Sequence, residues 1–170
     1  DDGSIDETLE ILKKYQIEDP RIKIVELSRN FGKESALTAG LDEAYGDAAI
    51  PIDADLQDPP ELIVRLIYYW DKGFDVVLTV RKSRKEERLF QRIITFWGYV
   101  ILEKLSNIAI TRNSGDFRLI SKRVANEYAQ FSEVNPFFRF LVDWIGYKQT
   151  KIFYYRKPRF FGKSNFKLIF

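Results

Sequence analysis

Two aspartates separated by a single residue follow a short apolar run in this chain. Asp53 and Asp55 come directly after residues 48–52 (AAIPI), and Gln57 stands two positions later. The apolar run predicts a short buried strand, and because alternate strand residues point to the same side, both carboxylates can face one cation. The chain contains no His and no Cys, so the expected ion is a hard, oxygen-liganded Mg²⁺ or Mn²⁺. Such an ion would neutralise charge on a diphosphate leaving group.

The lack of His and Cys also restricts catalysis. It excludes serine–histidine triads, histidine-bound zinc hydrolases and thiol enzymes, so acid–base chemistry falls to Asp, Glu, Lys and Tyr. Residues 1–111 hold 15 Lys and Arg against 21 Asp and Glu, a balance of −6, whereas residues 112–170 hold 12 against 4, a balance of +8. This asymmetry suits an enzyme with two phosphorylated substrates, although chance surface composition would give it too. The acidic part argues against nucleic acid as a partner.

Periodicity and capping signals predict alternating helices and strands up to residue 80. Ser4 and Glu7 have capping-box spacing, and Asp58 is placed to cap the helix that Pro59 and Pro60 open. Alternating β and α units indicate a largely parallel sheet covered by helices on both faces. The predicted elements are a helix from residue 4 to about 15, a strand over 22–27, a helix over 33–45, a strand over 48–52, a helix over 59–73 and a strand over 74–80.

Ligands of such sheets bind at the carboxyl ends of the strands. Asp1 and Asp2, residues 53–57 and Arg81 each follow a predicted or inferred strand end, so we expect them to gather at one edge. The chain has no initiator Met and opens on the turn-like sequence DDGS. We therefore interpret residues 1–170 as a single domain, cut from a longer protein, whose first strand precedes Asp1.

Residues 86–105 predict a helix with a broad apolar face, an aromatic cluster and a basic start. Two interpretations fit this pattern, a helix lying in a membrane interface and a helix packed in the core. No apolar run of about 18 residues, the length that a membrane-spanning helix needs, occurs in the chain.

Residues 53–61 (DADLQDPPE), together with RNFGKE at 29–34 and GDFRL at 115–119, resemble the polyprenyl-phosphate glycosyltransferases of the GT-A, family 2 group. That group includes dolichol-phosphate mannose synthases and bacterial undecaprenyl-phosphate sugar transferases. The resemblance covers nearly the whole chain. It implies a three-layer α/β/α GT-A (Rossmann-like) fold with a mostly parallel mixed sheet, and hydrophobic helices that follow the catalytic domain. It also favours the interfacial position for the 86–105 helix, where Trp97 and Tyr99 suit the headgroup level.

The resemblance assigns two overlapping groups of residues to the donor. The nucleotide-sugar would be bound by Asp1, Asp2, Arg29, Lys33 and Asp53. The metal that bridges the diphosphate would be held by Asp53, Asp55 and Gln57. From the pattern alone, Lys33 is equally well a solvated helix residue.

Asp116 stands where inverting family 2 enzymes place their catalytic carboxylate. As a general base it would take a proton from an acceptor hydroxyl. A lipid phosphate is already largely anionic at pH 7, and Asp116 would then orient the sugar or bind a cation that holds the phosphate. The resemblance assigns the acceptor phosphate to Arg81, Arg92, Arg159 and Ser164.

The resulting prediction is an inverting, metal-dependent glycosyltransferase that moves a sugar from a UDP- or GDP-sugar to an undecaprenyl or dolichyl phosphate. The resemblance places it at a membrane of the cell envelope, with the catalytic domain on the cytoplasmic face. Two alternatives stay open: a family 2 enzyme that acts on a polysaccharide or another hydroxyl acceptor, and a non-catalytic nucleotide-binding module that docks on membranes. The sugar, the base and the oligomeric state, a homo-oligomer included, also stay open.

Overall fold

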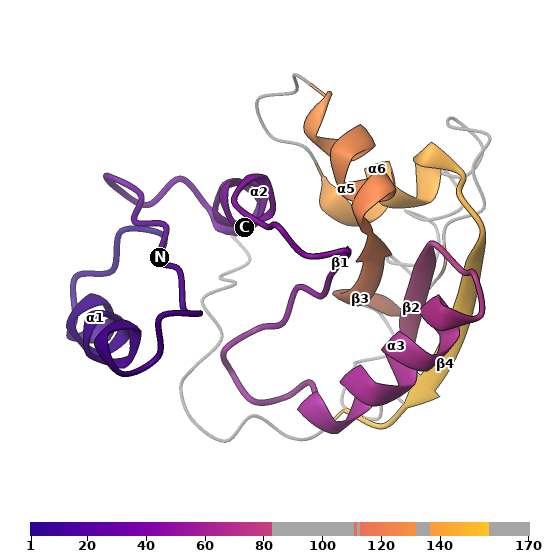
Figure 1. Cartoon of the computed structure of the whole chain (residues 1–170), viewed down its shortest axis with the longest axis horizontal. Helices are drawn as coiled ribbons and strands as arrows, with labels where there is room; N and C mark the ends of the chain where they lie inside the picture. The colour runs from indigo at the N-terminus through magenta and orange to yellow at the C-terminus, as the bar shows by residue number, and fades with distance from the viewer. Residues whose placement is uncertain (83–110, 112, 132–136, 157–170) are drawn as a thin grey trace, which may run out of the picture.

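The computed structural model describes residues 1–82, 111, 113–131 and 137–156 (Figure 1). Its helices are α1 (Thr8–Glu18), α2 (Lys33–Asp42), the short 3-10 helix η1 (Pro60–Leu62), α3 (Ile63–Asp71), α5 (Lys122–Ala129) and α6 (Phe138–Ile145). Its strands are β1 (Ala48–Ala49), β2 (Val76–Arg81), β3 (Ser114–Ser121) and β4 (Gln149–Tyr154).

The four strands form one mixed sheet in the order β1-β3-β2-β4. Strand β3 is antiparallel to both β1 and β2, and β2 is parallel to β4. Three strands therefore share one direction and β3 alone opposes them. This confirms the predicted α/β fold with a mixed sheet.

Helices cover both faces of this sheet, as the alternation of its strand residues requires. On one face Val76 and Leu78 of β2 pack with residues of α5 and α6, and α2 adds partly buried Leu37. On the other face Val77 packs with Leu66 of α3. Figure 1 shows α5 and α6 together on one side of the sheet and α3 on the other. The three-layer arrangement is thus built from two separate apolar clusters.

Several predicted boundaries differ from the observed ones. The strand predicted over 48–52 is limited to β1, because Pro51 has no N–H to donate to a ladder. Residues 22–27 form no strand. Their backbone hydrogen bonds to the N-terminal segment all involve Asp1, whose amino group donates to Val25 and whose carbonyl accepts from Leu27. Helix α2 ends three residues before the predicted boundary at Tyr45.

The predicted capping box at the first helix is wrong. Helix α1 begins at Thr8, preceded by Glu7 without a side-chain cap. The Ser4 hydroxyl donates to the Asp1 carboxylate instead, and so does the Ser4 backbone N–H, at 3.0 Å. Asp6 accepts from the Thr8 N–H at 3.1 Å. The nearby Asp1 carboxylate therefore competes successfully for the hydroxyl that would have capped the helix.

The predicted helix over residues 86–105 lies outside the described residues. Within the described parts of the chain, no helix has the length and apolar character needed to cross a membrane.

Candidate active site

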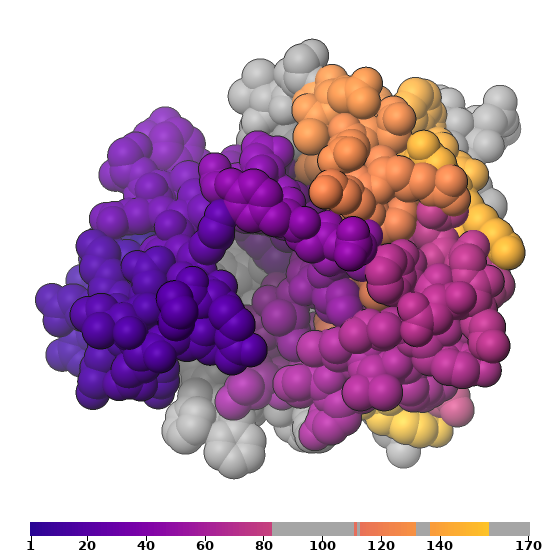
Figure 2. All heavy atoms as spheres, in the orientation of Figure 1, coloured from indigo at the N-terminus to yellow at the C-terminus, as the bar shows by residue number. Residues whose placement is uncertain are grey.

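A cleft of about 770 Å³ opens between the N-terminal segment and the sheet. Figure 2 shows the corresponding hollow beside the indigo N-terminal residues. Five residues that the sequence assigned to the donor or to catalysis line it, namely Asp1, Asp2, Lys33, Asp53 and Asp116. They come from the chain start, the first turn of α2, the segment after β1 and the middle of β3. Asp1, Asp2 and Asp53 therefore gather as expected, whereas Arg81, which was expected with them, and the donor residue Arg29 are not among the lining residues.

Lys33 joins the two acidic sides of the cleft. Its Nζ lies 2.7 Å from Oδ1 of Asp53 and 2.7 Å from Oδ2 of Asp116. Burial alone would lower the pKa of the Lys33 ammonium, but hydrogen bonds to Asp116 and Asp53 outweigh it and the pKa is raised. Lys33 is thus a charged bridge between the two carboxylates, with half of its side chain exposed.

Asp116 lies at an irregularity of the sheet. Leu78 of β2 faces Arg118, so a regular antiparallel register would place Val80 opposite Asp116, but Val80 faces Ser114 instead. The extra residues form a bulge, a feature that turns a side chain out of the regular pleat. The bulge accounts for a β3 carboxylate that reaches the cleft.

The second oxygen of Asp116 faces another cation. Nε of Arg139, from α6, approaches Oδ1 at 2.9 Å. The approach lacks hydrogen-bond geometry, so both atoms are buried without a hydrogen bond among the described residues. Burial raises the pKa of Asp116, but the Lys33 hydrogen bond and the charges of Arg139 and Lys33 prevail and the pKa is lowered. Asp116 is held as a carboxylate between two cations.

The acidic segment after β1 is a turn, although its side chains alternate as predicted. Leu56 has a positive φ of 57°, and the Gln57 N–H donates to Oδ1 of Asp55 at 3.1 Å. Asp53, Asp55 and Gln57 are partly buried, whereas Ala54 and Leu56 are exposed. The two carboxylates therefore face the same side without a strand to hold them.

Asp58 does not cap the helix that follows, contrary to the prediction. Pro59 precedes η1 without a side-chain cap. Asp58 is buried and accepts a hydrogen bond from the Tyr154 hydroxyl, and Nε of Arg156 lies 3.4 Å from its Oδ1. Burial and the Asp58 contact raise the pKa of the Tyr154 hydroxyl, which stays protonated at neutral pH. Strand β4 thereby anchors the acidic segment.

Arg156 brings a cation to the predicted metal ligands. Its Nη2 lies 4.0 Å from Oδ2 of Asp53 and 3.8 Å from Oδ2 of Asp55. One guanidinium nitrogen therefore lies within ion-pair distance of both carboxylates. Among the described residues, no group of three or more acidic side chains is arranged to hold a metal by itself. Mg²⁺ is usually held by one or two carboxylates plus substrate phosphates, so this pair fits such an ion when a diphosphate is bound.

Asp2 and Arg29 organise the entry to α2. The Asp2 carboxylate accepts from the N–H groups of Phe31 and Gly32, at 2.7 and 3.0 Å. A Cβ on Gly3, whose φ is +66°, would lie 2.5 Å from the Arg29 carbonyl carbon, so this close approach requires glycine. The chain start is thereby fixed against the loop that leads to Lys33.

Arg81, the predicted acceptor-phosphate residue in the described chain, is the last residue of β2 and lies against Gly115 of β3, next to Asp116. Its Nη2 is 2.9 Å from where a Cβ on Gly115 would stand, so the missing side chain of Gly115 makes room for the guanidinium. Nε of Arg81 donates to the Tyr154 hydroxyl at 3.4 Å. The other residues assigned to the acceptor, Arg92, Arg159 and Ser164, lie outside the described residues.

Behind Asp116 lies a buried ion pair that the sequence analysis missed. Arg118 is fully buried, and its Nη1 donates to Oδ1 of Asp143 at 3.1 Å. Its Nε and Nη2 donate to the Gly115 carbonyl at 3.3 and 3.1 Å, and Nη2 also donates to Ser114. Burial raises the pKa of Asp143 despite the neighbouring Arg118. Arg118 thus holds the bulge backbone that carries Asp116.

Glu34 supports the same region from α2. Its Oε2 accepts from the backbone N–H of Phe138 at 3.1 Å, which satisfies a free donor at the start of α6. Lys33 therefore contacts the Asp116 carboxylate, while Glu34 contacts the start of the helix that carries Arg139. The carboxylate partners of Arg118, Arg139 and Arg156 are distant in sequence, so no local spacing could have predicted these pairs.

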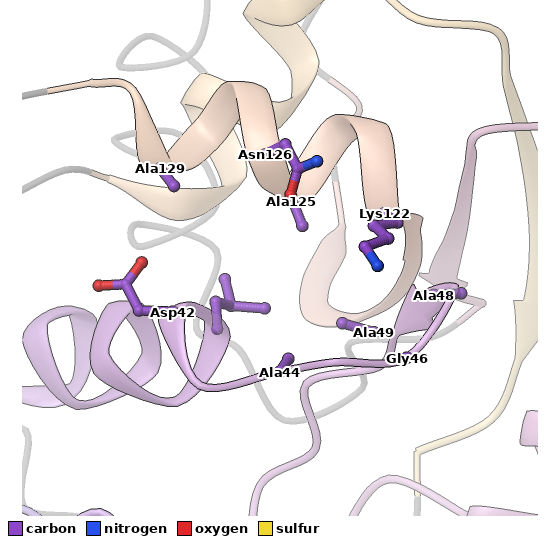
Figure 3. A pocket seen from close by; sticks show the side chains of 10 residues that line it. Asp42, Ala44, Gly46, Ala48, Ala49, Lys122, Ala125, Asn126 and Ala129 are labelled. Carbon is purple, nitrogen blue, oxygen red and sulfur yellow. The ribbon is translucent and has the colours of Figure 1, made fainter.

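A smaller cavity of about 130 Å³ adjoins the cleft, and Leu41, Ala44, Ala48 and Ala49 border both. Figure 3 shows it between the end of α2 and α5, with alanines on both walls and Asp42, Lys122 and Asn126 around it. Its walls carry little chemistry, and it extends the space next to the candidate site.

The chain is similar in sequence to known glycosyltransferases. The model of a family described as "Glycosyl transferase family 2" matches residues 1–129. The chain is 46% identical over 167 residues to an uncharacterized glycosyltransferase of Bacillus subtilis, covering 98% of this chain and 52% of that protein. It is 42% identical over 165 residues to a bactoprenol glucosyl transferase of Shigella phage SfX, covering 97% of this chain and 54% of that protein. A prophage bactoprenol glucosyl transferase homolog of Escherichia coli has the same identity and coverage. The chain spans about half the length of these relatives.

Proposed function

Because this chain belongs to glycosyl transferase family 2, we propose that it transfers a sugar from a nucleotide diphosphate donor to a membrane polyprenyl phosphate, with inversion at the anomeric carbon. Membership of the family confirms the resemblance predicted from residues 53–61, and with it the prediction of a glycosyltransferase. Relatives at 42% identity bear the name bactoprenol glucosyl transferase, which supports a polyprenyl phosphate as the acceptor.

The observation that carries this proposal is the Lys33 bridge. One ammonium contacts Asp53 and Asp116 at 2.7 Å each, in a cleft that Asp1 and Asp2 also line. In the proposal Asp53 faces the donor and Asp116 faces the transferred sugar. The bridge therefore sets the spacing between the leaving diphosphate and the reacting carbon, which is the kind of positioning that accelerates group transfer.

Asp53, Asp55 and Gln57 are the residues that would hold a divalent metal. Bound there, the metal would neutralise the charge that builds on the departing nucleoside diphosphate. Lys33 lies beside Asp53 and adds a positive charge on the same side. Asp1 and Asp2 line the cleft at the chain start, where they are proposed to meet the nucleoside.

The charge state of Asp116 favours a phosphate acceptor. A general base works best when its pKa is near the working pH, and the pKa of Asp116 is shifted downward, away from neutrality. A phosphate monoester, with a second pKa of about 6, is mostly dianionic at pH 7 and needs no base. Its oxygen forms the bond to the anomeric carbon while the bond from that carbon to the diphosphate oxygen breaks. Asp116 then orients the sugar.

Cations for the acceptor phosphate are grouped beside Asp116. Arg81 occupies the space above Gly115, and Arg139 contacts Asp116 directly. Arginine forks bind phosphate oxygens in pairs, which favours this side of the site for the acceptor. Since the acceptor is a lipid, we propose that the domain works at the membrane surface, on its cytoplasmic side.

A donor screen tests the proposal. The full-length protein is incubated with undecaprenyl phosphate and a panel of UDP- and GDP-sugars, with Mg²⁺, with Mn²⁺ or with a chelator. We expect one donor to yield a glycosylated lipid phosphate only when metal is present. Transfer from no donor would contradict the proposal. Titration calorimetry with UDP and GDP tests the alternative of a non-catalytic nucleotide-binding module, which would bind the nucleotide but transfer no sugar.

A further inference from the structure

Arg156 is a charged residue of the site to which the proposed reaction assigns no role. It follows β4 by two positions, and its side chain is 24% exposed. Its guanidinium faces three carboxylates of the acidic turn, at 3.4 Å from Asp58, 3.8 Å from Asp55 and 4.0 Å from Asp53. A single side chain from the far end of the sheet thus meets both predicted metal-ligand carboxylates.

The three contacts are unequal. Asp58 is the nearest and most buried partner, since it is only 2% exposed and also accepts a hydrogen bond from the Tyr154 hydroxyl. The contacts with Asp53 and Asp55 are longer than hydrogen bonds. Nε of Arg156, which makes the contact with Asp58, is buried and has no hydrogen bond among the described residues. Arg156 therefore lies beside all three carboxylates as an ion-pair partner, closest to Asp58.

We propose that Arg156 is the built-in counter-cation of the metal site. In the donor-free protein it adds positive charge beside Asp55 and beside Asp53, which the Lys33 ammonium also contacts at 2.7 Å, and so reduces the repulsion between these two carboxylates. A metal ion that approaches these carboxylates meets the positive guanidinium and must displace it. The donor diphosphate offers the displaced guanidinium new anionic oxygens, to which it can bind in a forked, charge-assisted manner.

This role has a thermodynamic consequence. Metal alone should bind weakly, because Arg156 competes for the same carboxylates. Metal together with a nucleoside diphosphate should bind more tightly, because the diphosphate accepts the guanidinium. By linkage, the metal and the nucleotide then raise each other's affinity by the same factor. The inference depends on the proposed function only for the presence of a metal at Asp53 and Asp55.

The test measures Mn²⁺ binding to the full-length protein without sugar or lipid, by electron paramagnetic resonance of the free ion. Arg156→Gln removes the charge, and Arg156→Lys keeps it. Arg21→Gln is the control, since Arg21 pairs with Asp19 at 2.7 Å outside the site. We expect Arg156→Gln to bind Mn²⁺ about threefold to fivefold more tightly, the effect of losing one partly exposed ion-pair partner. Arg156→Lys and Arg21→Gln should stay within about twofold of the unmodified protein.

Adding UDP or GDP gives the second arm. In the unmodified protein the nucleotide should raise Mn²⁺ affinity, and in Arg156→Gln it should raise it by a smaller factor. A merely structural role for Arg156 would lower Mn²⁺ affinity on substitution, so the direction of change separates the two roles. Circular dichroism checks that each variant folds, and Arg156→Met, which retains the alkyl stem, replaces Arg156→Gln if the latter unfolds.

Two results would overturn the inference: unchanged or weaker Mn²⁺ binding in the charge-removing variants, and no Mn²⁺ binding in any protein. A failure of the proposed function looks different. If Arg156→Gln binds Mn²⁺ more tightly but the unmodified protein transfers no sugar to undecaprenyl phosphate, glycosyl transfer is contradicted and the counter-cation role stands.

Discussion

The ammonium of Lys33 lies 2.7 Å from a carboxylate oxygen of Asp116. The first residue belongs to the start of α2 and the second to the bulge of β3, so the contact spans the cleft. Each group shifts the pKa of the other in the direction that keeps both charged. The cleft therefore contains a fixed charge pair before any substrate binds, which spares the reaction part of the cost of reorganisation.

Replacing Lys33 with Gln should reduce sugar transfer about a hundredfold, the usual effect of removing one preorganised charged or donor group from an active site. The loss should appear mainly in kcat, since the bridge sets the spacing between donor and sugar. Steady-state kinetics of the full-length protein measure it. Lys13→Gln is the control, because Lys13 forms an exposed ion pair with Glu26 outside the site. Equal activity of the two variants would refute a role for the bridge.

Replacing Asp116 with Asn should lower the rate of sugar transfer to a prenyl phosphate only moderately. The loss should be smaller than the 10²–10⁴-fold that removal of a general base usually causes. The amide keeps the size of the side chain and can still orient the sugar, while the anionic acceptor needs no proton removed. The initial rate at saturating donor is the measurement. A loss of about 10⁴-fold or more would identify Asp116 as an obligatory base and favour a hydroxyl acceptor.

Asp116 should also make stability depend on pH. Burial raises the pKa of Asp116, but Lys33 and Arg139 lower it by a larger amount, so the folded pKa is below the unfolded value of about 3.9. The contribution to stability is therefore present above that unfolded value and is lost as the pH falls through the folded pKa. Melting temperatures of the unmodified protein and Asp116→Asn should differ at pH 7 and converge below about pH 4. A gap that widens on acidification would have the wrong sign.

The Arg118–Asp143 pair should be costly to break. Arg118 is completely buried and holds the carbonyl of Gly115, so Asp143→Asn leaves it uncompensated. We expect a loss of roughly 3–5 kcal/mol in the free energy of unfolding. Chemical denaturation measures it. The double variant Arg118→Met/Asp143→Leu should recover much of this stability, yet transfer less sugar because the bulge is no longer held. A loss in the double variant equal to the sum of the losses in Arg118→Met and Asp143→Leu would argue against coupling.

Local patterns in the sequence predicted much of the donor side of the site. The absence of His and Cys is read from composition, and the spacing of Asp53 and Asp55 and the motif around Lys33 depend only on neighbouring residues. The cleft brings Asp1, Asp2, Lys33, Asp53 and Asp116 together as expected. The metal, the donor and the acceptor stay predictions, and Arg92, Arg159 and Ser164 lie outside the described residues.

The rest depended on contacts between distant segments. Asp58 looked like a helix cap because a cap is the local use of an aspartate before proline, but Tyr154 and Arg156 are its actual partners. Ser4 likewise had the spacing of a capping box and contacts Asp1 instead. Strand β3 interrupts the parallel arrangement, and its bulge has no signature that periodicity can detect. Helix propensity and residue spacing cannot predict when a contact formed in the folded chain replaces the local hydrogen bond that a motif suggests.

The most direct test compares two acceptors that differ only in the phosphate. The full-length protein is given its best nucleotide-sugar, a divalent metal, and either a short-chain prenyl phosphate or the corresponding prenol, and the lipid products are separated by mass. The account predicts sugar on the prenyl phosphate and none on the prenol, since the arginines beside Asp116 need an anion and Asp116 is a weak base. Transfer to the prenol at a comparable rate, or transfer to neither lipid, would contradict it.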